Sequence, residues 1–213
     1  RGVDMNITYK FETRINGKNI QCRAFTLEEY ANLIAAKKNC TIDECVKALL
    51  RECTNATGLN KQESELLIVI LWAHSIGEVN HEVTWNCTCG RKIPVPLNYT
   101  HAQIDPPEDL WYDLKGFKIK FKYPNLFDDS DIPMMISKCI DYIVVGNEQI
   151  YFNDLNDAEI DDLYSAITTE DVVNIKNMLL KPQVQLAVPI TCECGISHIH
   201  VIKGLKEFFK IMS

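Results

Sequence analysis

The chain has 213 residues, 46% of them hydrophobic, so it is long enough to bury a sizeable core. Its 22 Lys and Arg stand against 29 Asp and Glu, and a net charge of −7 disfavours the phosphate neutralisation on which nucleic-acid binding depends. The longest apolar run, residues 66–73, is far shorter than the roughly 20 residues that a membrane-spanning helix needs. The cysteine count of nine is odd and no signal peptide precedes them, so we expect a soluble protein of a reducing cytoplasm.

The first residues predict a β-hairpin. Residues 1–4 precede Met5 without a structural pattern, and we interpret them as a remnant of expression. Polar and apolar residues then alternate over residues 7–12, and a second strand is predicted over residues 20–25. Between them, Asn16-Gly17 is a strong turn signal, so an antiparallel hairpin should open the fold.

Three helices are predicted next. Each starts with a capping residue followed three positions later by a glutamate: Thr26 with Glu29, Thr41 with Glu44, and Asn60 with Glu63. In the third helix, residues 66–73 are apolar around the whole circumference, which is typical of a helix surrounded by protein. His74 follows this run and is either a structural residue or a further candidate metal ligand.

Two Cys-x-Cys-Gly sequences form the strongest motif, at residues 87–90 and 192–195. Strand-like segments flank both, so each pair should lie at a hairpin tip: 81–85 with 91–97, and 184–191 with 198–202. Zinc favours four tetrahedral thiolates, and two facing tips would close such a shell without leaving a position open for water or substrate. We therefore predict a discontinuous zinc-ribbon-like unit with structural zinc on four ligands: Cys87, Cys89, Cys192 and Cys194.

Two other interpretations of the cysteines stay open. Four reduced cysteines can pack as small apolar residues. A mixed shell can instead include His198 and His200, which share one face of a predicted strand beside the second pair. If a metal joins the pairs, it closes a loop of roughly 100 residues and couples metal affinity to folding.

The segment between the pairs predicts an inserted lobe. After Asp105-Pro106-Pro107, apolar residues alternate with lysines over residues 117–123, which indicates a half-buried strand. The lysines, Lys118, Lys120 and Lys122, either form a solvated face that discourages edge pairing or contact an acidic partner or phosphate.

Helices should dominate the rest of this lobe. One is expected from Pro133 to just before Gly146, with an apolar face of four residues: Ile136, Cys139, Ile140 and Ile143. A short return strand at residues 149–152 follows, and two more helices should start at Asn156 and Thr169. We expect an α+β fold with a main domain of residues 5–97 and 184–213 and a mainly helical inserted lobe of residues 98–183.

The C-terminus predicts one more helix with a narrow apolar stripe of four residues: Leu205, Phe208, Phe209 and Met212. Such a stripe must dock on an apolar surface. It either packs on the protein's own core or binds in the groove of a partner.

Catalysis has little support in the sequence. It contains no Gly-rich phosphate loop, no His-Glu-x-x-His and no Gly-x-Ser-x-Gly. A metallohydrolase would need an open metal position and a base, for which Glu193 or His198 could serve. A nucleic-acid-binding zinc ribbon is a second alternative, suggested by Trp85, Arg91 and Lys92 around the first pair.

The order of hairpin, helices, first cysteine hairpin, insert and second cysteine hairpin, with the ending from Gly204 to Phe209, resembles the baseplate protein family of T4-like tailed bacteriophages. The resemblance covers nearly all of residues 5–213. It implies a non-enzymatic virus protein, made in the host cytoplasm, that helps to build the hub of a contractile-tail baseplate. Its role would be that of an assembly factor or chaperone, or of a minor component retained in the virion. Its partners would be hub proteins rather than nucleic acid.

Overall fold

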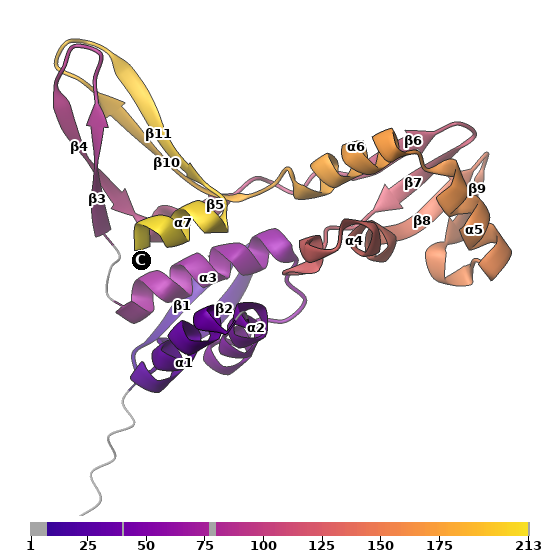
Figure 1. Ribbon diagram of the computed structural model, residues 1–213, viewed down its shortest axis with the longest axis horizontal. Coiled ribbons are helices and arrows are strands. Elements are labelled where there is room, and N and C mark those ends of the chain that lie inside the picture. The colour runs from indigo at the N-terminus through magenta and orange to yellow at the C-terminus, as the bar shows by residue number, and fades with distance from the viewer. Residues whose placement is uncertain (1–7, 40, 77–79, 213) are drawn as a thin grey trace, which may run out of the picture. The chain divides into compact units, whose positions relative to one another are not determined.

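The computed structural model describes residues 8–39, 41–76 and 80–212, except the side chains of residues 80, 211 and 212. The chain divides into two units, of which unit 1 comprises Arg1–Ile104 and Gln183–Ser213 and unit 2 comprises Asp105–Pro182. The fold is mixed, with α-helices and antiparallel hairpins (Figure 1). Residues 1–7, which include the predicted expression remnant and the start of the first strand, lie outside the described residues.

The two segments of unit 1 meet in one small sheet. Strand β5 (Gln103–Ile104) pairs antiparallel with β10 (Val184–Thr191), with Ile104 opposite Val184. Unit 2 is therefore inserted between two neighbouring strands, a connection that brings its two ends together. This boundary lies beyond the predicted residue 98, because Tyr99 and Ala102 are buried in the core of unit 1.

Unit 1 opens with the predicted hairpin. Strands β1 (Lys10–Ile15) and β2 (Lys18–Arg23) pair antiparallel around Asn16 and Gly17. Both turn residues have positive φ, at 46° and 79°, as the predicted Asn-Gly turn requires. The Asn16 side chain also donates a 2.6 Å hydrogen bond to Glu63 Oε1, which ties the turn to a helix.

Three helices follow: α1 (Leu27–Lys38), α2 (Ile42–Cys53) and α3 (Lys61–Ile76). Reciprocal capping hydrogen bonds form at Thr26 with Glu29 and at Asn60 with Glu63, as predicted. Helix α2 also starts directly after Thr41, as predicted, but the Thr41 side chain makes no capping hydrogen bond. Thr41 has φ −110° and ψ 23°, whereas a capping residue normally has extended backbone angles.

Helix α3 is the centre of unit 1, as its apolar run predicted. Leu67, Val69 and Ala73 are fully buried. The helix lies between the β1–β2 hairpin and the C-terminal helix α7 (Leu205–Met212), and β10 also contributes to its surroundings (Figure 1). A helix enclosed in this way must be apolar on all sides, which explains why residues 66–73 show no polar face.

An ion pair links the first hairpin to α1. Arg23 donates hydrogen bonds of 2.9 Å and 2.7 Å to the two carboxylate oxygens of Glu29. These bonds from Arg23, aided by a bond from the Thr26 backbone, lower the pKa of Glu29 from 4.5 to about 2, although partial burial acts in the opposite direction.

We predict that Glu29 contributes to acid sensitivity. A group whose pKa is depressed by folding stabilises the protein above its unfolded pKa, and this contribution is lost as the pH falls from 4.5 toward about 2. Glu29→Gln should therefore lower the urea midpoint at neutral pH, and its difference from the wild type should shrink toward pH 2. The exposed neighbour Glu28 provides the control, Glu28→Gln, and an equal acid response in both variants would contradict the prediction.

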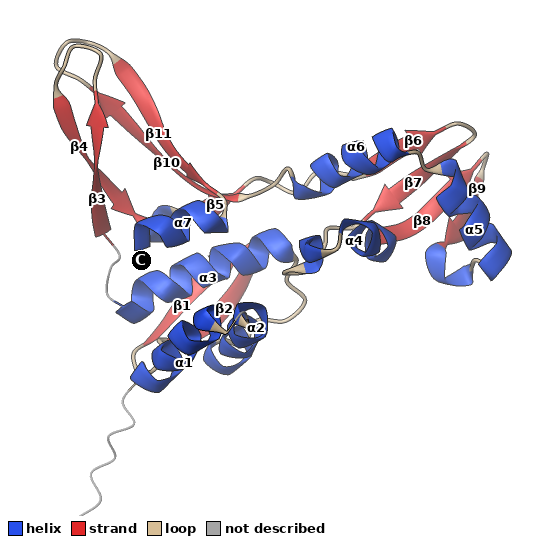
Figure 2. Cartoon of the chain, in the orientation of Figure 1, coloured by secondary structure: helices blue, strands red, loops and turns tan. Residues whose placement is uncertain are grey.

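Unit 2 is built on a four-stranded antiparallel sheet in the order β6-β7-β8-β9 (Figure 2). The strands are β6 (Trp111–Leu114), β7 (Phe117–Phe121), β8 (Ile140–Val145) and β9 (Glu148–Tyr151). Its helices are α4 (Ile132–Cys139), α5 (Asp157–Ala166) and α6 (Thr169–Leu180). One cross-strand row joins the helices in a shared core: Tyr112, Ile119, Ile143 and Ile150. The unit thus contains more β structure than a mainly helical lobe.

The helix predicted from Pro133 to Gly146 is wrong in its second half. Helix α4 ends at Cys139, and Ile140 starts β8. The segment Ile-Asp-Tyr-Ile-Val-Val is rich in β-branched and aromatic residues, which favour strands. Pairing with β7 and β9 decided the outcome, because the apolar spacing of this segment suits either element.

Candidate metal centre

The four predicted ligands lie at the tips of two hairpins in unit 1. Strands β3 (Asn80–Asn86) and β4 (Lys92–Asn98) form the first, and β10 and β11 (Ser197–Lys203) form the second. Both hairpins are antiparallel and surround the cysteine pairs as predicted. The two tips lie next to each other (Figure 1).

The turns that carry the thiols share one backbone geometry. In each, the N–H of the first cysteine donates to the carbonyl four residues later, and the glycine N–H donates back to that cysteine's carbonyl, at 2.8–2.9 Å. Gly90 and Gly195 have φ values of 87° and 89°, in the region that side chains other than glycine rarely adopt. The Gly of each motif is thus required by the turn, not by the thiols.

The hairpins bring four sulfur atoms together. Cys87 Sγ lies 3.6 Å from Cys194 Sγ, and Cys89 Sγ lies 3.7 Å from Cys192 Sγ. All four lie within 4.8 Å of one another, although Cys89 and Cys192 are 103 positions apart in the sequence. Cys87 and Cys192 are buried, whereas the other two thiols are on the exposed side of the cluster.

These separations fit a tetrahedral ion. Zinc–sulfur bonds of about 2.3 Å place the sulfurs of a tetrahedral shell roughly 3.8 Å apart. The Cys87–Cys194 and Cys89–Cys192 separations, 3.6 and 3.7 Å, are close to that value and far from the roughly 2.05 Å of a disulfide. Four thiolates also complete the coordination of zinc, so this geometry suits a structural site better than a catalytic one.

The surroundings of the cluster shift the pKa values of its two buried thiols, Cys87 and Cys192, in opposite directions. The Cys89 backbone N–H lowers the pKa of Cys87 to about 7, against the effect of burial, and the neighbouring thiols add to this lowering. At Cys192 the Cys194 backbone also favours the thiolate, but burial and the nearby Cys194 and Cys87 thiols raise the pKa overall. The cluster therefore favours the thiolate at Cys87 and disfavours it at Cys192, unless a bound cation compensates the negative charge.

The surrounding side chains join the two tips further. Arg91 Nη1 and Glu193 Oε2 form an ion pair between the hairpins. The ring of His198 stacks on Trp85, with centroids 4.9 Å apart and planes 3° from parallel. Of the residues suggested for nucleic-acid contact, Trp85 and Arg91 are thus engaged across the two hairpins with the suggested general bases, His198 and Glu193.

The alternative ligands lie elsewhere. Among the residues whose side chains the structure describes, the group that could hold a metal consists of the four cysteines and includes no histidine. His74 stacks on Phe11 with a centroid distance of 4.1 Å, and burial lowers its pKa. The mixed Cys-His shell therefore has no geometric support.

The terminal stripe packs inward. Phe208 is 0% exposed, and Leu205 and Phe209 pack against the same core. The side chain of Met212 lies outside the described residues. This packing agrees with docking on the protein's own core, and partner binding through the stripe stays a prediction.

Two of the three lysines that alternate with apolar residues in and after β7 form ion pairs. Lys118 lies 3.3 Å from Asp113, and Lys120 lies 2.8 Å from Asp109. These ion pairs reduce the positive charge that the row offers to phosphate. They favour the interpretation of the lysines as a solvated sheet face.

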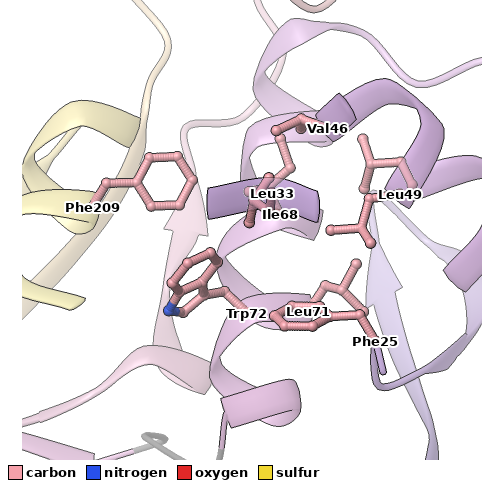
Figure 3. A pocket seen from close by; sticks show the side chains of 9 residues that line it. Phe25, Leu33, Val46, Leu49, Ile68, Leu71, Trp72 and Phe209 are labelled. Atoms are coloured by element: carbon pink, nitrogen blue, oxygen red, sulfur yellow. The ribbon is translucent and has the colours of Figure 1, made fainter. Parts of the chain in front are cut away.

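A small apolar cavity lies among four helices of unit 1 (Figure 3). Its lining consists of Phe25, which precedes α1, and of side chains from α1, α2, α3 and α7: Leu33, Val46, Leu49, Leu50, Ile68, Leu71, Trp72 and Phe209. No titratable side chain is among them, and ligand sites normally combine an apolar pocket with a few placed polar groups. The cavity is a packing feature of the core rather than a candidate active site.

Within residues 8–39, 41–76 and 80–212, no helix has both the length and the apolar character that crossing a membrane requires.

Comparison with known proteins gives the class of this protein. Residues 5–210 match the family described as T4 bacteriophage base plate protein, and the chain belongs to this family, as the resemblance predicted. It is 58% identical over 205 residues to the "Baseplate hub assembly protein gp26" of Enterobacteria phage T4. That alignment covers 96% of this chain and 99% of the relative. No solved structure matches the chain.

Proposed function

We propose that this chain is a baseplate hub assembly protein of a T4-like phage that acts by binding other tail proteins and catalyses no reaction. The observation that carries this proposal is the 58% identity to the T4 hub assembly protein over nearly the full length of both chains. Because the alignment covers 96% of this chain, it includes both units, which supports a shared role of the two proteins.

The metal is part of the proposal. A zinc ion on Cys87, Cys89, Cys192 and Cys194 would hold the two hairpins of unit 1 together and supply a fixed, four-coordinate link rather than a reactive centre. Its role would be to staple a scaffold for protein binding. The protein would act in the host cytoplasm during tail assembly. It could then stay in the baseplate of the finished virion as a minor component.

The two alternative functions have less support. A metallohydrolase needs an open coordination position, whereas four clustered thiolates fill the shell. A nucleic-acid-binding ribbon needs free positive charge near the tips, but Arg91 is paired with Glu193 and the whole chain has a net charge of −7.

Co-purification with the baseplate hub proteins tests the proposed function. The tagged full chain, expressed with the baseplate hub proteins of its phage, should co-purify with at least one of them at a fixed stoichiometry. Because protein interfaces with apolar centres are less salt-sensitive than phosphate contacts, the complex should persist to about 0.5 M salt.

A tail protein from outside the baseplate provides the matched control and should not co-purify. Failure of every hub protein to bind would contradict the proposal. Binding to a single-stranded oligonucleotide that weakens steeply with salt would instead support the zinc-ribbon alternative.

A further inference from the structure

The sheet of unit 2 has two different faces. The row Tyr112, Ile119, Ile143 and Ile150 belongs to the core that it shares with α4, α5 and α6. The neighbouring row points the opposite way, because successive strand residues alternate between faces. Its members lie directly opposite one another across all four strands: Trp111, Lys120, Tyr142 and Tyr151. We call this row the outer row.

The three aromatic rings of the outer row contact one another. Trp111 and Tyr142 meet edge to face with ring centroids 5.6 Å apart, and Tyr142 meets Tyr151 in the same way at 5.6 Å. Lys120 Nζ lies 5.0 Å from the centre of the Trp111 ring. Trp111 is 38% exposed and Tyr151 is 51% exposed, so large aromatic side chains of this four-stranded sheet reach solvent.

The charge around the outer row selects the kind of partner. Asp105–Pro182 contains 16 Asp and Glu against 7 Lys and Arg, a net charge of −9, whereas the rest of the chain has 13 against 15, a net charge of +2. Two lysines on this face of the sheet are themselves paired, Lys120 of the outer row with Asp109 and its neighbour Lys118 with Asp113. Unit 2 therefore repels phosphate and attracts cationic groups.

We propose that the outer row is a docking surface for an arginine-bearing patch of a baseplate hub protein, an inference that rests on the proposed function. Arginine is the cation that stacks flat on Trp and Tyr rings, and it is less strongly hydrated than lysine. Tryptophan, tyrosine and arginine are also the residues that contribute most to protein–protein affinity. The aromatic contacts within the row hold the rings in place before binding, which reduces the entropy lost on association.

The first test uses a double variant of the full chain, Trp111→Ala with Tyr151→Ala. Binding to the hub protein that co-purifies with the wild type should weaken about 10-fold or more, because truncation of central aromatic contacts has effects of this size. The matched control is Tyr164→Ala with Val173→Ala, which removes exposed apolar side chains from α5 and α6 of the same unit. The control should bind as the wild type does, and both variants should keep the wild-type metal content and unfolding temperature.

The second test identifies the contacted residues. With benzoylphenylalanine in place of Tyr151, irradiation of the complex should link unit 2 to a hub-protein peptide that contains arginine. Replacement of that arginine by lysine in the hub protein should weaken binding, because lysine retains the charge but not the flat stacking. A photoreactive residue in place of Tyr164 should give no adduct.

The outcomes separate this inference from the proposed function. If no hub protein binds the wild type, the proposed function fails and the docking surface fails with it. If the wild type binds and the Trp111/Tyr151 variant binds equally well while folded, only the docking surface is overturned. Adducts to a second copy of this chain, or to an oligonucleotide, would overturn it in the same way, since the occupant would be of another kind.

Discussion

Replacement of Cys87 by serine should abolish stoichiometric metal binding and lower the unfolding temperature by about 10 °C or more. The wild type, purified without added metal, should contain close to one zinc per chain. Structural zinc binds the folded state and contributes its binding free energy to folding, and in a chain of this size each kcal/mol corresponds to about 2–4 °C. Mass spectrometry for metal and calorimetry for unfolding provide the two measurements.

The effect should reach beyond the tips. Zinc would join Cys89 to Cys192, which are 103 positions apart, so loss of the metal frees both hairpins and weakens the support that β10 gives to α3. Chelator treatment of the wild type should reproduce the Cys87→Ser result, and hydrogen exchange should quicken in β4 and β10.

The control for this experiment is Cys45→Ser. Cys45 lies in α2, outside the cluster, and its thiol is only partly buried. This variant should keep its zinc and its unfolding temperature. A metal-free wild type whose unfolding is insensitive to chelator would show that the four thiols hold no metal and would favour the reduced, packed cysteines that the sequence also allowed.

Phe208→Ala should destabilise the protein by about 3–5 kcal/mol, the range for removal of a buried aromatic ring. Phe208 is fully buried in the core of unit 1, where its ring lies 6.0 Å from that of Tyr99. Its loss would leave a cavity between α7 and the elements that it covers. Urea unfolding of the full chain measures the change in free energy.

The exposed residue Lys206 of the same helix provides the control, because Lys206→Ala should change stability by no more than about 0.5 kcal/mol. The variant also tests the predicted partner-binding role of the stripe. If Phe208→Ala leaves the protein fully stable but prevents association with a hub protein, the stripe binds a partner rather than the core.

Local signals were predictable where the residues that make them are close in sequence. Asn60 and Glu63 cap α3 through mutual hydrogen bonds, and Asn16-Gly17 forms a turn whose backbone angles few other residue pairs adopt. Thr41 and Glu44 have the same spacing but do not form the capping hydrogen bond, because the chain enters α2 with a different backbone conformation. A capping pattern therefore indicates a helix start more reliably than it indicates the hydrogen bond.

The second half of the predicted 133–146 helix shows where a local pattern is not sufficient to predict the element. Ile140 and Ile143 have a spacing that suits a helix face, yet both lie in β8 between two partner strands. The outer row was missed for a related reason. Trp111, Tyr142 and Tyr151 come from three separate segments, and only the strand register places them side by side.

By itself, the sequence determined the two thiol turns, the buried central helix and the membership of a phage baseplate family, because these depend on short motifs, composition and residue identity along the chain. The tertiary structure alone showed that the two thiol turns, predicted to share one site, do lie together, that the terminal stripe packs inward and that three aromatic rings and a lysine form one row. These are distances between segments far apart in sequence. Such distances follow from how hairpins pack and in what register strands pair, which no local pattern specifies.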